Sequence, residues 1–93
     1  MKYVWDEEKN VSNFSKHEVW FEEAQTVFAD ANALELYDEE HSSHDEERFI
    51  VLGFSSKPRL LTVVYCERHD DEIRIISARK ASRKEFSDYE KRV

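Results

Sequence analysis

The stretch LLTVVYCERHDDEIRIISARKA, residues 60–81, contains two β-prone segments separated by a short polar turn. The first covers residues 60–68 and the second residues 73–81, and each passes into arginine near its end. Both are apolar on both faces over part of their length, as central strands are when they are covered above and below. We therefore predict that this pair forms the centre of a sheet.

Two further β-prone segments precede this pair, ALELY at residues 33–37 and RFIVLGF at residues 48–54. Polar or proline-containing turns divide the four segments, which favours pairing between consecutive strands. The pattern predicts a four-strand, mostly antiparallel meander.

Helical patterns flank this meander on its N-terminal side. Residues 2–5 indicate a short opening strand, after which Asp6 can cap a helix that runs to about His17. Apolar residues then recur at helical spacing between residues 21 and 28 and predict a second short helix that ends near Asp30.

A last helix follows the meander, because Ser82 and Glu85 have the spacing of a capping box. The predicted order is strand, two helices, four strands and a C-terminal helix. We expect an α+β fold in which helices cover one side of the sheet and the other face stays partly free.

Length and composition limit the possible classes of protein. A chain of 93 residues, 40% of them hydrophobic, is long enough for one folded domain, which we expect to span residues 1–93. Its single cysteine allows no internal disulfide. The N-terminal residues have no apolar run of a signal peptide or membrane span, so we expect a cytoplasmic protein without membrane contact.

Charge is distributed unevenly along the chain. Residues 1–47 hold 14 acidic residues and 3 lysines, whereas residues 48–93 hold 11 basic and 7 acidic residues. We expect two different surfaces, one that repels polyanions and one that can bind them.

Arginines lie at the ends of three predicted strands, at Arg48, Arg68 and Arg79. Hairpin pairing can bring such side chains together, although Arg68 and Arg79 should lie at opposite ends of an antiparallel pair. Together with the basic residues that follow position 79, they favour a phosphate-binding surface over solvated strand ends.

The predicted first helix carries a polar ridge of Lys9, Asn13, Lys16 and His17, spaced so that all four share one face. A histidine beside lysines is suited to phosphodiester cleavage. The alternative is that Lys16 and His17 only complement the helix dipole at the C-terminus.

His41 and His44 in HSSHDEER could indicate a metal site, but no second ligand cluster or cysteine pair accompanies them. We expect neither a metal nor another cofactor.

Several strings together resemble one family in order along nearly the whole chain: WDEEKNVSNFSKHEV, FEEAQTVFAD, EHS, EERFIVLGFS, RLLTVVYCER and IRIISARKASRKEFSDYE. They are similar to BrnT, the toxin of a type II toxin–antitoxin pair. The resemblance implies a fold like that of the RelE ribonucleases and a metal-independent endoribonuclease that inhibits translation. It also implies that the toxin forms a hetero-oligomer with a BrnA-type antitoxin. Only the antitoxin would contact the operator DNA.

The resemblance also implies roles for individual residues. It implies Arg48, Arg68 and Arg79 as phosphate ligands and Lys16 and His17 as proton handlers, with Glu47 and Glu85 orienting arginines. RNA contacts would come from Lys9, Asn13, Arg74 and Ser77, and the family pattern further includes His41 and Tyr89. We add Lys80 and Arg83 to the RNA contacts because they are basic residues beside Arg79.

This chain departs from the family pattern at three positions. Glu18 stands where a glycine usually ends the first helix, and Trp20 stands where a small hydroxyl residue usually caps the second. Cys66 replaces the more usual threonine. We expect the fold to tolerate these changes.

Two other functions remain open. The chain could be a catalytically weak module whose main task is to bind the DNA-binding antitoxin and modulate autorepression. A metal-dependent hydrolase that uses His41 and His44 is the third hypothesis.

Overall fold

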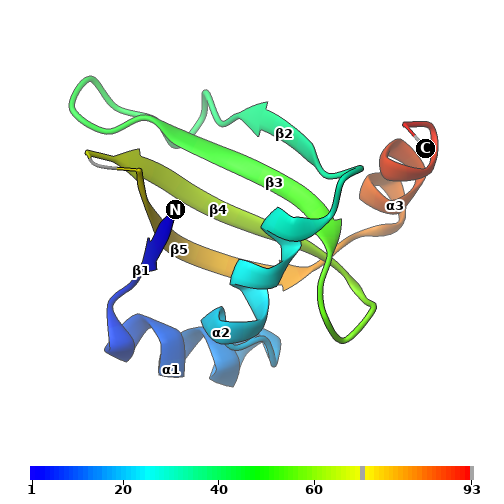
Figure 1. The fold of residues 1–93 in the computed structure, drawn as a ribbon, viewed down its shortest axis with the longest axis horizontal. Helices are drawn as coiled ribbons and strands as arrows, with labels where there is room; N and C mark the ends of the chain where they lie inside the picture. The colour runs from blue at the N-terminus through cyan, green and yellow to red at the C-terminus, as the bar shows by residue number, and fades with distance from the viewer. Residues whose placement is uncertain (70, 93) are drawn as a thin grey trace.

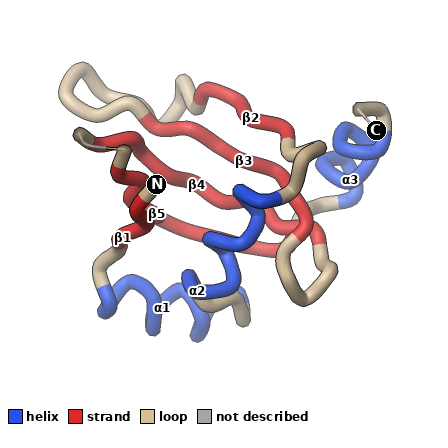
Figure 2. The backbone as a smooth tube through the Cα atoms, viewed as in Figure 1, coloured by secondary structure: helices blue, strands red, loops and turns tan. Residues whose placement is uncertain are grey.

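The computed structural model of this protein describes residues 1–69 and 71–92. Figure 1 shows the ribbon, and Figure 2 the same view coloured by secondary structure. The elements in chain order are β1 (Lys2–Val4), α1 (Glu7–His17), α2 (Phe21–Ala24), the 3₁₀ helix η1 (Gln25–Ala29), β2 (Leu34–Tyr37), β3 (Arg48–Phe54), β4 (Leu60–Arg68), β5 (Glu72–Lys80) and α3 (Arg83–Glu90).

The five strands form one sheet in the order β1-β5-β4-β3-β2. Neighbours among β2, β3, β4 and β5 pair antiparallel, and β1 pairs parallel with β5. The α+β class is therefore confirmed. In this order β4 and β5 are both interior strands, as their apolar sequences predicted.

The main core lies between the sheet and the segment that holds α2 and η1. Phe21, Ala24 and Val27 are fully buried against strand residues such as Val63 and Ile75. In Figure 1, α2 and η1 cross in front of the sheet, while α1 lies along its lower side, next to β5. Burial of this apolar surface is the main favourable term in the folding of a domain of this size.

The opposite face of the sheet, which we call the outer face, is covered only at one end. Tyr89 of α3 packs there against Leu52 and Leu60. The expectation that all helices lie on one side of the sheet was therefore wrong for α3. Its apolar stripe needs a partner, and the apolar end of the outer face supplies one.

The helix caps agree with the sequence. The Asp6 carboxylate accepts hydrogen bonds from the backbone N–H groups of Glu8 (2.8 Å) and Lys9 (3.4 Å). Ser82 and Glu85 form both bonds of the predicted capping box. The second predicted helix is present, but α2 ends after one turn and the chain continues as η1 to Ala29.

The turn between α1 and α2 keeps its geometry despite the two family departures. Glu18 adopts the left-handed conformation, with φ 59°, that glycine would adopt without steric cost. Trp20 makes no side-chain capping bond at the start of α2. Instead, the buried Asn10 of α1 accepts a hydrogen bond from the Phe21 N–H (2.7 Å) through its side-chain oxygen.

No helix in residues 1–69 and 71–92 has the length and hydropathy needed to cross a lipid bilayer.

Candidate functional site

Helix α1 is attached to the edge of β5 by the side chain of Asn13. Its amide donates to the backbone carbonyls of Ala78 (2.9 Å) and Val19 (2.8 Å), and its oxygen accepts from the Ala78 N–H (3.1 Å). Strand β1 pairs with β5 only as far as Arg74, so Ala78 has no neighbouring strand on this side. The Asn13 amide supplies the hydrogen bonds that such a strand would make with Ala78. Because its N–H groups and its oxygen all bond to backbone groups, the Asn13 side chain positions α1.

This attachment brings the polar ridge of α1 beside the basic end of β5. Two adjoining hollows share Lys16 and His17. One is completed by Ser15, Glu18, Arg79 and Lys80. The other is completed by Lys9, Ser12, Asn13, Ile76 and Ser77. We call the two hollows together the α1–β5 groove. The groove unites two sets of residues that the sequence analysis had selected separately.

A β-bulge in β5 directs Arg79 to the outer face. Along the β4–β5 ladder, Val64 pairs with Ser77 and Tyr65 with Ile75, so Ile76 has no partner. Strict alternation would have put Arg74 and Arg79 on opposite faces of the sheet. The extra residue shifts the alternation by one, so that Arg74, Ser77 and Arg79 all lie on the outer face.

Arg79 is held by a two-point ion pair with Glu85 of α3. Its Nη1 and Nη2 atoms donate to the two carboxylate oxygens at 2.8 and 2.9 Å. The hydrogen bonds from Arg79 are the main reason why the pKa of Glu85 is lowered to about 2, and the same pairing raises the pKa of Arg79. Glu85 also accepts from the Ser82 N–H (2.8 Å), so the capping box of α3 orients Arg79. The prediction that Glu85 orients an arginine is confirmed.

Three other arginines lie around Cys66 on the outer face. Arg48 and Arg74 pair with Cys66 from its two sides, and Arg68 follows two residues later on the same face of β4. We call Arg48, Arg68 and Arg74 the arginine cluster. Burial raises the pKa of the Cys66 thiol against the opposing effect of these three cations. The carboxylate that binds Arg48 is Glu46 (3.0 Å). Glu47, which we expected to orient an arginine, forms no ion pair within residues 1–69 and 71–92.

Arg48, Arg68 and Arg79 do not form a single pocket. Arg79 pairs with Thr62, which lies four residues from Cys66 along β4, or about 13 Å at the usual rise of a strand. The outer face therefore carries two cationic regions, the arginine cluster near one end and Arg79 near the other. The antiparallel register accounts for this separation, as expected for Arg68 and Arg79.

Other sequence candidates lie outside the groove. Arg83, the first residue of α3, is exposed and lines neither hollow. Tyr89 is buried and donates to Asp30 (2.7 Å), and burial and this bond raise its pKa to about 12. His41 contacts the carboxylate of Asp38 (3.0 Å). In the part of the chain that the structure describes, no three His, Cys, Asp or Glu side chains are grouped like metal ligands.

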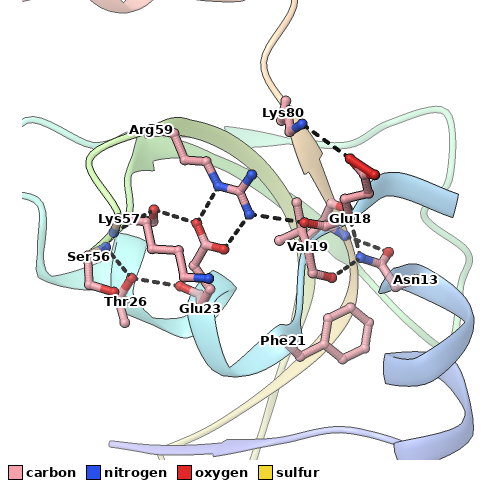
Figure 3. A network of polar contacts seen from close by, with 12 residues as sticks. Asn13, Glu18, Val19, Phe21, Glu23, Thr26, Ser56, Lys57, Arg59 and Lys80 are labelled. Carbon is pink, nitrogen blue, oxygen red and sulfur yellow. Dashed lines mark hydrogen bonds and ion pairs between the residues drawn. The ribbon is translucent and has the colours of Figure 1, made fainter. Parts of the chain in front are cut away.

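The sequence analysis missed the ion pair between Arg59 and Glu23, shown in Figure 3. Arg59 binds both oxygens of the buried Glu23 carboxylate at 2.6 and 2.7 Å and also donates to the backbone carbonyl of Glu18 (3.0 Å). These bonds join the β3–β4 turn to α2 and to the turn that follows His17. No sequence signal identifies Arg59, because its partners lie 36 and 41 residues away.

Comparison with known proteins supports this fold. The crystal structure of the ribonuclease toxin BrnT from Brucella abortus superposes with a TM-score of 0.69 and 22% sequence identity, over 89% of this chain and 99% of that one. No curated protein sequence matched the chain. A family model described as the ribonuclease toxin BrnT of type II toxin–antitoxin systems matches residues 5–85. Since this match covers most of the sequence, the chain belongs to the BrnT family of ribonuclease toxins.

Proposed function

We propose that this chain is a metal-independent endoribonuclease that inhibits translation and is neutralised by a BrnA-type antitoxin. The observation that carries the proposal is the α1–β5 groove, where Lys16 and His17 lie in the same hollow as Arg79. A proton acceptor and a phosphate-binding cation in one hollow are the two requirements of RNA cleavage without a metal.

In the proposed reaction, the ribose 2′-hydroxyl attacks the adjacent phosphorus and forms a 2′,3′-cyclic phosphate. The 5′-oxygen of the next nucleotide leaves as a hydroxyl after it takes a proton from water or from the protonated partner in the Lys16–His17 pair. His17 or Lys16 accepts the proton of the attacking hydroxyl. Arg79 stabilises the negative charge that develops on the phosphoryl oxygens, and its orientation is set in advance by Glu85. Lys9, Ser77 and Lys80 line the groove and contact the RNA backbone on either side.

The arginine cluster serves a different purpose in this proposal. The cluster lies about 13 Å along β4 from the strand position of Arg79, so in this proposal Arg48 and Arg68 take no part in the chemical step. We infer that these residues, with Arg74, bind a more distant phosphate of the same RNA strand. Such contacts contribute to affinity in a salt-dependent manner and leave the rate of the chemical step unchanged.

The proposal includes the setting in which the toxin acts. Residues 1–93 act as one RelE-like toxin domain in the cytoplasm. The antitoxin forms a hetero-oligomer with the toxin and supplies the contact with operator DNA. The acidic N-terminal half of the toxin disfavours direct DNA binding.

The test is cleavage of a single-stranded RNA by purified, antitoxin-free protein in the presence of EDTA. We expect cleavage to persist in EDTA and Arg79→Ala to lower kcat about 100-fold. Lys84→Ala, a change at an exposed lysine of α3, is the matched control and should retain full activity. Arg48→Ala should raise KM, mainly at low salt, with little change in kcat. RNA that stays intact at micromolar enzyme would refute the proposed activity.

The second candidate function is the catalytically weak module that binds the antitoxin. The pairing of Arg79 with Glu85 favours it, because a carboxylate already occupies the guanidinium fork. Induced expression in growing cells separates the two functions. An active toxin arrests growth and its Arg79→Ala variant does not, whereas a module without activity leaves growth unchanged in both forms.

A further inference from the structure

Strand β2 forms one edge of the sheet. The Asp38 N–H donates to the Arg48 carbonyl on β3 (2.9 Å). Because hydrogen-bonded pairs alternate in an antiparallel ladder, Leu36 and Leu34 also bond towards β3, and Glu35 and Tyr37 direct their N–H and C=O groups away from it. Among residues 1–69 and 71–92, no strand pairs with this edge.

The side chains of β2 are exposed beside these backbone groups. Leu36 is 50% exposed and Tyr37 47% exposed, although both are large and apolar. Leu36 lies on the outer face in the same row as Ile50 and Val64, which are only partly buried. An added strand would cover Leu36 and Tyr37 and would continue this apolar row. Exposed apolar side chains next to an open edge are a common feature of β-augmentation sites.

Charge determines which partner can use this edge. Residues 30–47, which include β2, contain eight acidic residues and no lysine or arginine. Glu39 and Glu40 are exposed directly after the strand. A second copy of the chain would bring two such segments together, and RNA would add its own negative charge, so both are repelled. A segment that carries lysine or arginine is attracted.

We propose that the β2 edge receives an extended, basic segment of the antitoxin, which adds to the sheet as a sixth strand. This inference rests on the proposed function, because it takes the antitoxin as the partner. The partner's backbone bonds to Glu35 and Tyr37, its apolar residues cover Leu36, and its basic residues pair with Glu39 and Glu40. The edge lies on the opposite side of the sheet from the α1–β5 groove. The antitoxin therefore has a docking site separate from the groove in which RNA is cleaved.

The decisive variant is Tyr37→Pro, with Tyr37→Val as its matched control. Both remove the aromatic ring, but only proline removes the outward N–H, and it leaves the ladder to β3 intact. Affinity for a purified BrnA-type antitoxin is measured by isothermal titration calorimetry. We expect Tyr37→Pro to bind about tenfold more weakly than Tyr37→Val, which corresponds to the loss of one backbone hydrogen bond.

A charge variant keeps the test conclusive if Tyr37→Pro is poorly folded. Changing both Glu39→Lys and Glu40→Lys at exposed positions should weaken antitoxin binding about tenfold at low salt and less at high salt. The free variant should keep the wild-type kcat for RNA cleavage, because neither residue is near the groove.

Three results would overturn the inference. Equal affinity of Tyr37→Pro and Tyr37→Val, with unchanged binding by the charge variant, would locate the antitoxin elsewhere and leave the toxin function intact. A wild-type dimer that Tyr37→Pro dissociates would assign the edge to a second copy. Failure of the wild type to bind the antitoxin would overturn the proposed partnership too, whereas RNA cleavage is tested independently of it.

Discussion

The two sides of the sheet differ in whether the outward backbone groups of the outer strand have hydrogen-bond partners. On the β5 side, helix α1 lies against the strand and the Asn13 amide satisfies the N–H and C=O of Ala78. On the β2 side, the outward groups of Glu35 and Tyr37 have no partner within the described chain. The covered side carries a basic groove, and the open side is acidic.

In our proposals, this difference keeps the RNA and the antitoxin at separate places on a small domain. A helix that bonds to a strand through a buried amide is fixed in position, so its lysines and histidine have defined distances to Arg79. Such fixed geometry is what catalysis requires. An open strand offers backbone groups to a partner that brings its own strand, and the local charge selects that partner.

The largest expected effect comes from the ion pair between Arg59 and Glu23, which joins the β3–β4 turn to α2. Arg59→Ala leaves the buried Glu23 carboxylate without its cation and frees the carbonyl of Glu18. We expect a loss of about 3 kcal/mol in the free energy of unfolding, measured by urea denaturation. Leu36→Ala on the open side should cost less than about 1 kcal/mol, because the side chain is half exposed. Equal losses of unfolding free energy in the two variants would contradict the view that the β5 side is held by buried contacts and the β2 side is open.

The second prediction concerns the attachment of α1 itself. Asn13→Ala leaves the N–H and C=O of Ala78 without partners, and we expect a loss of about 2 kcal/mol in unfolding free energy. Hydrogen exchange at the Ala78 amide should become faster by a larger factor than at Val63 in the neighbouring strand, which keeps its ladder bonds. Unchanged protection of Ala78 would mean that the amide does not hold α1.

The third prediction is a pH dependence at the groove. The pKa of Glu85 is about 2, below its ordinary value of 4.5, because Arg79 stabilises the carboxylate. The resulting stability is fully present above about pH 4.5 and is lost as pH falls towards 2. Both partners are partly exposed, so we expect Glu85→Gln to cost on the order of 1 kcal/mol at pH 7. The difference from the wild type should shrink in acid. A difference independent of pH would point to the capping box instead.

The smallest expected effect is a gain in stability at the turn after α1. Glu18 holds a left-handed conformation, and Glu18→Gly should stabilise the protein by up to about 1 kcal/mol. Glu18→Ala removes the same carboxylate and keeps the steric conflict, so it should bring no gain. Thermal unfolding of the three proteins under one condition compares them. If Glu18→Ala raises the stability as much as Glu18→Gly, the gain comes from removal of the carboxylate charge and not from relief of the backbone conformation.

Local signals in the sequence predicted most of the elements. Asp6, Ser82 and Glu85 act as helix caps as expected, because capping depends on residues at most three positions apart. The position of α3 could not be predicted in the same way. Its apolar stripe fits either face of the sheet, and only Leu52 and Leu60 on the outer face decide between them.

The sequence predicted the individual residues of the candidate site but not which of them lie together. Lys16 and His17 were selected from helical spacing, and Arg79 from its place at a strand end. Their meeting depends on Asn13 and Ala78, which lie 65 residues apart. Arg48 and Arg68 were grouped with Arg79 because all three stand at strand ends, and the register of the antiparallel ladder separates them.

The sequence by itself determined the order of strands and helices, the caps, and the division into an acidic and a basic half. Each of these depends on neighbouring residues or on composition. Only the tertiary structure decided that the ridge of α1 meets the end of β5, that Arg79 joins Arg74 on the outer face, and that β2 keeps a free edge. Those outcomes depend on one unpaired residue in a ladder and on contacts between distant segments, which no local pattern encodes.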